Sequence, residues 1–228
     1  MLKTLEKRLI VSCQAPVDSP LHDPQIIAAI AQASVLQGAA GVRIDTPSHI
    51  KETRKQLPQT PIIGLWKQQI PDYEVYITPR FQDAIAIAEA GADIIAIDAT
   101  LRDRPEGETA ASLIAKIHEQ LGKLVMADID DLESAIAAAE AGADIIGTTL
   151  YGYTGSTSQK SPPGWELLSQ IVEKLDVPAI CEGGVASPEM AKKALDLGAH
   201  AVVVGTAITG IDLKVKAFQS VFTAVDRR

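Results

Sequence analysis

One segment recurs four times in this chain of 228 residues, and it constrains the fold more than any other feature. The copies read QGAAGVRID (37–45), EAGADIIAID (89–98), EAGADIIGTT (140–149) and DLGAHAVVVG (196–205). In each copy the first glycine follows a helical stretch and precedes a short apolar run. This order is typical of a left-handed residue just past a helix end, followed by a buried strand. The glycines concerned are Gly38, Gly91, Gly142 and Gly198.

Four further β-rich runs lie between the copies, and helical stretches separate all eight runs. The additional strands are expected in LIVSCQ (9–14), IIGLWK (62–67), LVMADI (124–129) and AICEGG (179–184). The clearest helices are expected at 24–37, 81–90, 131–141 and 187–197, with Asp130 and Ser187-Pro188 as caps. Strands without in-and-out alternation are buried on both faces, as in a parallel sheet covered by helices.

Eight βα units in this length predict an α/β protein, a single (β/α)8 TIM barrel whose one domain spans 1–228. A doubly wound open sheet is the alternative. The chain has no GxGxxG motif after the first strand, and this absence disfavours the alternative.

Composition excludes several classes of protein. The chain is 46% hydrophobic and carries 21 Lys and Arg against 29 Asp and Glu, a net charge of −8. It has no apolar run of the roughly 18 to 20 residues that a membrane span needs, and no secretory signal. A negative chain without a Lys/Arg cluster disfavours nucleic acid and membrane surfaces as partners. Cys13 and Cys181 are interpreted as reduced core cysteines, so we expect a cytoplasmic protein.

Polar residues stand where each predicted strand ends, which in this fold is where chemistry collects. They are Gln14, Arg43 with Asp45, Lys67, Asp98, Asp128, Thr148 with Thr149, Glu182, and Gly205 with Thr206. Lysine and glutamate are rarely buried unless they are paired or functional. The set therefore indicates an active site rather than an ordinary rim.

Lys67 and Glu182 are the candidate reactive groups. Lys67 follows the third strand and is interpreted as a proton donor or acceptor, or as a Schiff-base nucleophile; the alternative is a solvated lysine. Burial and a nearby cation can tune the pKa of Glu182 for general-base work, whereas the alternative is a structural ion pair with Lys67 or Arg43. The third and seventh strands face each other across an eight-stranded barrel, so the two side chains should approach a substrate from opposite walls.

Glycine-rich turns after the last two strands predict a phosphate site. Gly183-Gly184 and Gly205-Thr206 let backbone N–H groups approach an anion, and these two loops commonly hold phosphate in this fold, although plain tight turns are the alternative. Tyr153, in the long loop after the sixth strand, is interpreted as a lid residue. The four histidines fall away from the strand ends, so no metal site is expected; a cation held by Asp128 and Asp130 is the minority alternative.

Several of these segments resemble N-acetylmannosamine-6-phosphate 2-epimerases. They are SCQA, GVRID, GLWK, YITP, DIIAIDATLRDRP, MADI, GADIIGTTLYGYT, CEGG and GAHAVVVGTAIT, in order from about Cys13 to Thr209. The resemblance implies an isomerase of sialic-acid catabolism that interconverts N-acetylmannosamine 6-phosphate and N-acetylglucosamine 6-phosphate without a cofactor. It implies that Lys67 and Glu182 are the catalytic pair. Two positions depart from that family: Gly184 and Gly210 stand where basic residues are common.

The implied reaction suits the residues. Epimerisation at C2 removes a proton next to the aldehyde of the open-chain sugar and returns one on the other face. Arg43 is expected to stabilise negative charge or hold the carboxylate, and Gln14 and Asp128 to position sugar groups. The expected partner is a small amino sugar phosphate, and a homodimer is left open. A class I aldolase using Lys67 and a non-catalytic sugar-phosphate sensor remain as alternatives.

Overall fold

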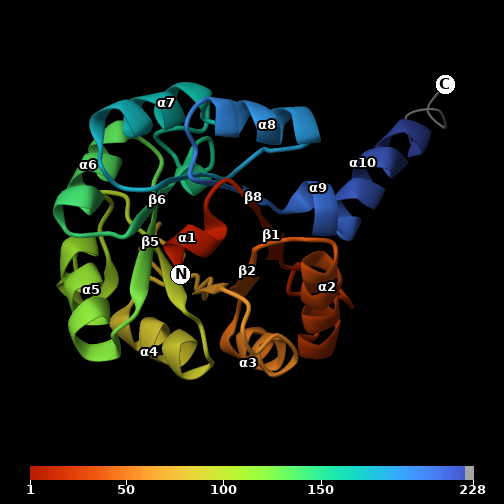
Figure 1. Ribbon diagram of the computed structural model, residues 1–228, viewed down its shortest axis with the longest axis horizontal. Helices are drawn as coiled ribbons and strands as arrows, with labels where there is room; N and C mark the ends of the chain where they lie inside the picture. The colour runs from red at the N-terminus through yellow and green to blue at the C-terminus, as the bar shows by residue number, and fades with distance from the viewer. Residues whose placement is uncertain (224–228) are drawn as a thin grey trace.

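The computed structural model describes residues 1–223, so the expected domain's residues 224–228 lie outside the described range. Eight strands form a closed parallel barrel in which each pairs with the next along the chain and β8 pairs with β1 (Figure 1). The (β/α)8 prediction is confirmed, and the closed strand order excludes the doubly wound sheet.

The elements follow the predicted alternation of strands and helices. The strands are β1 (Leu9–Cys13), β2 (Gly41–Asp45), β3 (Ile62–Leu65), β4 (Ile94–Asp98), β5 (Leu124–Asp128), β6 (Ile145–Gly147), β7 (Ala179–Cys181) and β8 (Ala201–Val204). The α-helices are α1 (Leu2–Leu5), α2 (Pro24–Leu36), α3 (Pro47–Gln56), α4 (Phe81–Glu89), α5 (Ala110–Lys116), α6 (Leu132–Glu140), α7 (Trp165–Lys174), α8 (Pro188–Asp196), α9 (Thr206–Thr209) and α10 (Ile211–Thr223). Short helical turns are η1 (Pro105–Gly107), η2 (Ile117–Leu121) and η3 (Thr148–Leu150).

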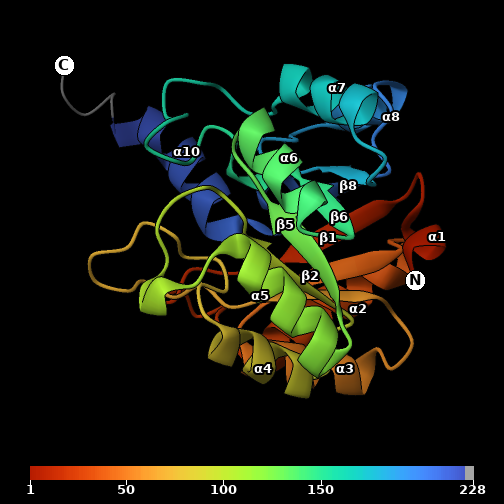
Figure 2. The same ribbon diagram turned by 90° about the vertical axis from the view of Figure 1, so that its left-hand side faces the viewer.

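Apolar side chains form two layers, one inside the barrel and one between the strands and the helices. The inner cluster includes Ile10, Ile63 and Met126, and Leu5 of α1 joins it. Figure 2 shows α1 at one end of the barrel and the longer loops at the other end. Cys13 and Cys181 are unpaired, buried and part of the outer cluster, as predicted for core thiols.

The recurring glycines have the predicted conformation. Gly38, Gly91, Gly142 and Gly198 have φ of +99°, +103°, +91° and +97°, each just past a helix end. A residue with a side chain is strained at such angles, which explains why every copy of the repeat keeps glycine there.

Side-chain caps fix the starts of two predicted helices. Ser187 caps α8 by accepting from the backbone N–H of Met190, as expected. The cap of α6 is Asp131 rather than the predicted Asp130, because Asp131 adopts the extended conformation and accepts from the N–H of Ser134. Asp130 is buried and bonds the Ser134 hydroxyl instead.

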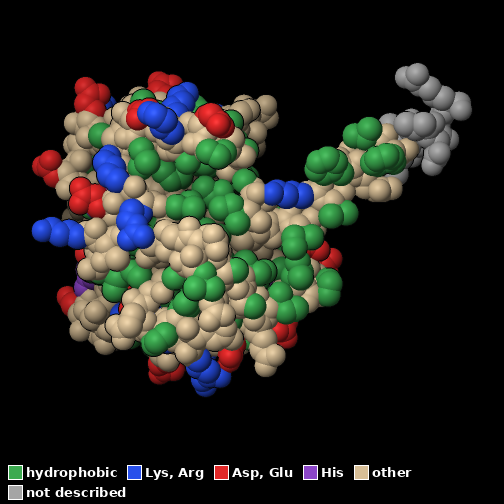
Figure 3. All heavy atoms as spheres, turned by 45° about the vertical axis from the view of Figure 1, so that its right-hand side comes forward, with side chains coloured by type: hydrophobic (Ala, Val, Ile, Leu, Met, Phe, Trp, Pro, Cys, Tyr) green, Lys and Arg blue, Asp and Glu red, His purple; other side chains and the backbone are tan. Residues whose placement is uncertain are grey.

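The helix that follows β8 departs from the regular pattern. Instead of lying along the barrel, α10 extends outward between α8 and α2 (Figure 1). Its exposed large apolar residues are Ile211, Leu213, Val215, Phe218, Val221 and Phe222. Figure 3 shows hydrophobic side chains along the projecting helix, and others on the barrel face beside its base. Within residues 1–223, no helix has the length and apolar character of a membrane span.

Candidate active site

A cavity of about 1080 Å³ opens at the carboxyl ends of the strands. It is lined by most of the residues that the sequence singled out, namely Gln14, Arg43, Lys67, Tyr153, Glu182, Gly183, Gly184, Gly205 and Thr206. The exceptions are Asp98, Asp128 and Thr148, which are buried and do not line the cavity.

The two-residue period of the strands explains why these side chains converge. The side chains of Ile63 and Leu65 belong to the inner cluster. Because alternate side chains point to the same side of a strand, the side chain two residues further on, Lys67, also points inward. By the same rule Ile180 is followed on the inner side by Glu182, while Cys181 faces the helices. The polar groups thus form the layer just beyond the apolar plug of the barrel.

Arg43 joins two acidic groups at the bottom of the cavity. Its Nη1 and Nη2 donate to Asp128 Oδ1 and Oδ2 at 3.0 and 2.6 Å, a bidentate pair. The same Nη1 donates to Glu182 Oε2 at 2.8 Å. Burial disfavours the guanidinium cation, but the two carboxylates outweigh this and raise the pKa of Arg43. The ion pair between Glu182 and Arg43, which the sequence offered as the alternative to a general base, is present. Glu182 still lines the cavity, so the ion pair does not exclude a role in proton transfer.

Glu182 is in an environment suited to proton transfer near neutral pH. Burial raises its pKa to about 7; Arg43 opposes this rise, and the charge of Asp128 adds to it. Thr149 supplies a further restraint, because its hydroxyl donates to Asp128 Oδ1 at 2.5 Å and lies 3.2 Å from Glu182 Oε2. A carboxyl with a pKa near the working pH can both accept and return a proton.

Lys67 is held on the opposite wall. Its Nζ donates to Gln14 Oε1 at 2.6 Å, and its backbone N–H donates to Asp45 Oδ1 at 3.0 Å. The lysine follows β3 and the glutamate follows β7, four strands apart in the closed order of eight. The predicted placement of the two groups on facing walls is confirmed. Gln14, which the sequence predicted to position the substrate, instead accepts the hydrogen bond from Lys67 and orients the Lys67 ammonium in this structure.

The glycines after β7 and β8 form the other end of the cavity. Gly183 and Gly184 have φ of +97° and +70°, and within residues 1–223 their N–H groups have no hydrogen-bond acceptor. A Cβ on Gly184 would lie 2.7 Å from the backbone carbon of Pro162. A Cβ on Gly210 would lie 2.8 Å from Thr206 Cα. The two departures from the family pattern are therefore sterically required in this backbone.

The loop after β6 closes one side of the cavity. Tyr153 is 56% exposed, and its ring lies 3.4 Å from the position of a Cβ on Gly183. The adjacent loop is fixed by the buried Asp130, which accepts from the hydroxyls of Thr154 and Ser156 at 2.7 and 2.9 Å. This anchorage places Tyr153 at the mouth, where the sequence expected a lid residue.

Several cavity residues were missed as site residues from the sequence. Thr149 was noted as a strand-end residue, and its side-chain parity could have placed it beside Glu182. Tyr76 lines the cavity, and burial raises its pKa to about 12. His22 also lines the cavity, from the loop after β1 rather than from a strand end. Within residues 1–223, no three or more His, Cys, Asp or Glu side chains are grouped to hold a metal ion.

A barrel with facing acid–base groups and glycine loops of this kind belongs to the phosphate-binding class of (β/α)8 enzymes. The model of the family described as "Putative N-acetylmannosamine-6-phosphate epimerase" matches residues 27–224. The chain is 60% identical over 224 residues to a "Putative N-acetylmannosamine-6-phosphate 2-epimerase" of Synechococcus elongatus, covering 98% of this chain and 97% of the relative. The relative of the same name in Thermosynechococcus vestitus is 64% identical, over 95% of this chain and 93% of its own. This chain is a member of that epimerase family.

A solved structure agrees in sequence and in fold. It is the N-acetylmannosamine-6-phosphate 2-epimerase of Clostridium perfringens, 41% identical, with a TM-score of 0.92 over 97% of this chain and 96% of that chain. A thiamine phosphate pyrophosphorylase of Pyrococcus furiosus, 18% identical with a TM-score of 0.62 over 91% of this chain and 90% of its own, shares the barrel alone.

Proposed function

We propose that this protein interconverts N-acetylmannosamine 6-phosphate and N-acetylglucosamine 6-phosphate by moving a proton at C2. The observation that carries the proposal is the pair on facing walls, Glu182 after β7 and Lys67 after β3, in one cavity with glycine loops. Family membership supports the choice of substrate.

The reaction needs two proton-transfer groups on opposite faces of one carbon. In the open-chain sugar, one group takes the C2 proton and leaves an enolate across C1 and C2. The other group then donates a proton to the opposite face of C2, so no atom is gained or lost overall. In the reverse direction the same two groups exchange roles. Glu182, with a pKa of about 7, and the Lys67 ammonium suit these roles.

Arg43 serves this chemistry by orienting Glu182 and by placing positive charge at the bottom of the cavity. Its two bonds to Asp128 fix the plane of the guanidinium, and the third bond fixes Glu182 Oε2. We assign Asp128 to hold Arg43, since it does not line the cavity. Preorganised charge of this kind stabilises an enolate without rearrangement during the reaction.

Incubation with N-acetylmannosamine 6-phosphate in D₂O, followed by NMR, tests the proposal. Deuterium should enter C2 as the second epimer appears. In parallel, borohydride with substrate should leave Lys67 unmodified, because the epimerase requires no imine. Absence of exchange at C2, or a reduced adduct on Lys67, contradicts the proposed reaction.

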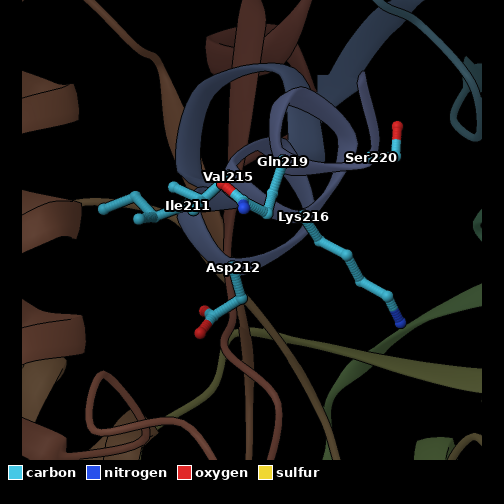
Figure 4. Close-up of a pocket in the computed structure, with 6 residues that line it drawn as sticks. All are labelled: Ile211, Asp212, Val215, Lys216, Gln219 and Ser220. Atoms are coloured by element: carbon cyan, nitrogen blue, oxygen red, sulfur yellow. The ribbon is translucent and has the colours of Figure 1, made fainter. Parts of the chain in front are cut away.

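We further propose that the protein is a homodimer in which each α10 packs on the other copy. Ile211, Val215, Phe218 and Phe222 are spaced as one face of a helix, and Phe218 is 75% exposed. Beside this helix lies a hollow of about 600 Å³, lined by Ile211, Asp212, Val215, Lys216, Gln219 and Ser220 (Figure 4).

The geometry favours a second copy as the partner of that face. Each of β1 to β7 is followed by a helix on the barrel wall, whereas α10 projects past it and contacts α9. A second copy carries the same surplus helix and the same apolar barrel face beside its base (Figure 3). If each α10 packs on the barrel of the other copy, the apolar faces of both helices and both barrels are covered. Such a dimer has two-fold symmetry and leaves no open interface.

A cytoplasmic location fits these features. Cys13 and Cys181 are free, and burial raises the pKa of both thiols to about 12, so they are poor nucleophiles for disulfide exchange. Fractionation of cells followed by immunoblotting tests the location, and the protein is expected in the cytoplasmic fraction.

A further inference from the structure

The glycine end of the cavity has unpaired N–H groups, but its loops contribute no cationic side chain. Within residues 1–223, the lysines and arginines that line the cavity are Arg43, Lys67 and Lys214. Arg43 is bonded to Asp128 and Glu182, and Lys67 follows β3, where the proposed function uses its ammonium for proton transfer at C2. Lys214 is therefore the cation that remains for an anionic group of the substrate.

Lys214 lies beside the loop that follows β8. It belongs to the first turn of α10, where its backbone N–H donates to the carbonyl of Gly210 at 3.0 Å. Its Nζ donates to the carbonyl of Ala207, the residue directly after Thr206. The side chain thus folds back over α9 toward the glycine loops, although its helix points away from the barrel.

The charge of Lys214 is not neutralised within the described part of the chain. No carboxylate of residues 1–223 forms an ion pair with its Nζ, which contacts a neutral carbonyl. Asp212 lines the same wall, but its Oδ2 accepts from the Ser19 hydroxyl at 3.1 Å. An exposed ammonium without a counter-ion can turn from a carbonyl to a phosphate at little cost, and a charge-assisted bond to phosphate is the stronger one.

The loops themselves have no room for another cation. A side chain at Gly184 would meet the Pro162 carbonyl oxygen at 2.8 Å, at a φ of +70°. A side chain at Gly210 would meet the Thr206 carbonyl oxygen at 2.9 Å. Both contacts are with backbone, which cannot move aside as a flexible side chain does.

We infer that Lys214 binds the 6-phosphate of the substrate, together with the backbone N–H groups of Gly183 and Gly184. The inference rests on the proposed function for the identity of the phosphate ester, but not for the presence of a phosphate site. It makes the base of α10 part of the substrate site, so the projecting helix has a role in binding as well as in assembly.

Four substitutions test the inference: Lys214→Met, Lys214→Gln, Lys214→Arg and, as the matched control, Lys216→Met. Lys216 lies on the same helix and lines the hollow beside α10, not the cavity. Binding of inorganic phosphate is measured by calorimetry, and KM and kcat are measured with N-acetylmannosamine 6-phosphate and with the free sugar. Circular dichroism verifies folding, and because Lys214 is an exposed side chain, Lys214→Gln serves as a second neutral variant.

For Lys214→Met we expect phosphate binding to weaken about 10- to 100-fold, the usual size of one charge-assisted bond. KM for the phosphorylated sugar should rise by a similar factor, kcat should change less than about threefold, and kcat/KM for the free sugar should not change. Lys214→Arg should retain most of the affinity, and Lys216→Met should behave like the wild type.

The outcomes separate this inference from the proposed function. If Lys214→Met and Lys214→Gln bind phosphate as tightly as the wild type, the inference is wrong even when epimerisation is intact. If the wild type binds no phosphate, the inference is equally wrong. If the wild type binds phosphate in a Lys214-dependent way but does not exchange the C2 proton, the proposed function fails and the assignment of Lys214 stands.

Discussion

At the scale of single residues, a small number of charged groups are held where their charge matters. Arg43 is 1% exposed and forms ion pairs with both Asp128 and Glu182. Asp128 therefore helps to fix Glu182, the carboxylate that faces the cavity, through the guanidinium of Arg43. Removing one partner of such a buried pair leaves an uncompensated charge. The position of Glu182 therefore depends on Asp128, a residue that does not line the cavity.

Replacing Glu182 with Gln should abolish most of the activity while the protein stays folded. Glutamine keeps the shape but cannot accept the C2 proton, so we expect a loss of about 10²- to 10⁴-fold in kcat. Because burial raises the pKa of Glu182 to about 7, the carboxylate is protonated below that pH. In the direction that uses it as the base, wild-type kcat/KM should fall as the pH drops through about 7. Steady-state rates from pH 5 to 9 measure this limb, and a flat profile would contradict the assignment.

Replacing Gly184 with Ala should destabilise the protein. Its φ of +70° is unfavourable for alanine, and the new methyl would lie 2.7 Å from the Pro162 backbone carbon. We expect a loss of about 1–3 kcal/mol in the free energy of unfolding. Gly155 offers the control, since a Cβ there meets no atom within 4 Å. Urea unfolding of both variants gives the comparison, and equal stabilities would show that the Pro162 backbone can shift.

At the scale of elements, the loop after β6 depends on one buried carboxylate. Asp130 is 3% exposed and accepts from the hydroxyls of Thr154 and Ser156, which follow Tyr153 closely in the chain. The fixed loop keeps the tyrosine ring against Gly183. The strands supply the reactive groups, and this loop decides how well the cavity is closed.

Replacing Asp130 with Ala should loosen that loop more than it affects the barrel. Two hydroxyls lose a charged acceptor, so amide hydrogen exchange at 151–160 should rise about tenfold or more. KM should rise while kcat falls less, because Lys67 and Glu182 stay in place. The control is Ser158→Ala, whose hydroxyl bonds only the Gly155 carbonyl within the described residues. If amide hydrogen exchange at 151–160 is unchanged in Asp130→Ala, the Asp130 carboxylate does not fix the loop.

At the scale of the whole molecule, the barrel and α10 have different requirements. The barrel buries its apolar layers within one chain, whereas α10 leaves a face of large apolar side chains on the outside. The proposed second copy would supply a partner for that face without any change in the barrel. Since Lys214 lies in the first turn of the same helix, the proposed assembly and the proposed phosphate binding would share one element.

The double change Phe218→Asp and Phe222→Asp should convert a dimer into a monomer. Two carboxylates in the apolar stripe cannot be buried without a large desolvation cost. Lys51→Asp/Lys55→Asp, on exposed positions of α3, places the same two carboxylates elsewhere on the surface. Sedimentation of the three proteins gives the masses. A monomeric wild type, or a double variant that still dimerises, would contradict the exchange of α10.

The sequence by itself determined the barrel and most of the candidate residues that line its cavity. Four copies of one helix–glycine–strand segment, together with the four runs between them, predicted eight βα units. The order of these units placed Lys67 and Glu182 at the ends of facing strands. Features of this kind depend on residues that are close together in the chain, so they can be recognised in a single sequence. Tertiary structure decided what depends on distant neighbours: that Asp128 holds Arg43 below the cavity, and that Gln14 supports Lys67. It also decided that the last helix leaves the barrel and brings Lys214 back to the cavity, because its apolar stripe looks the same in sequence whether it packs on its own barrel or projects away from it.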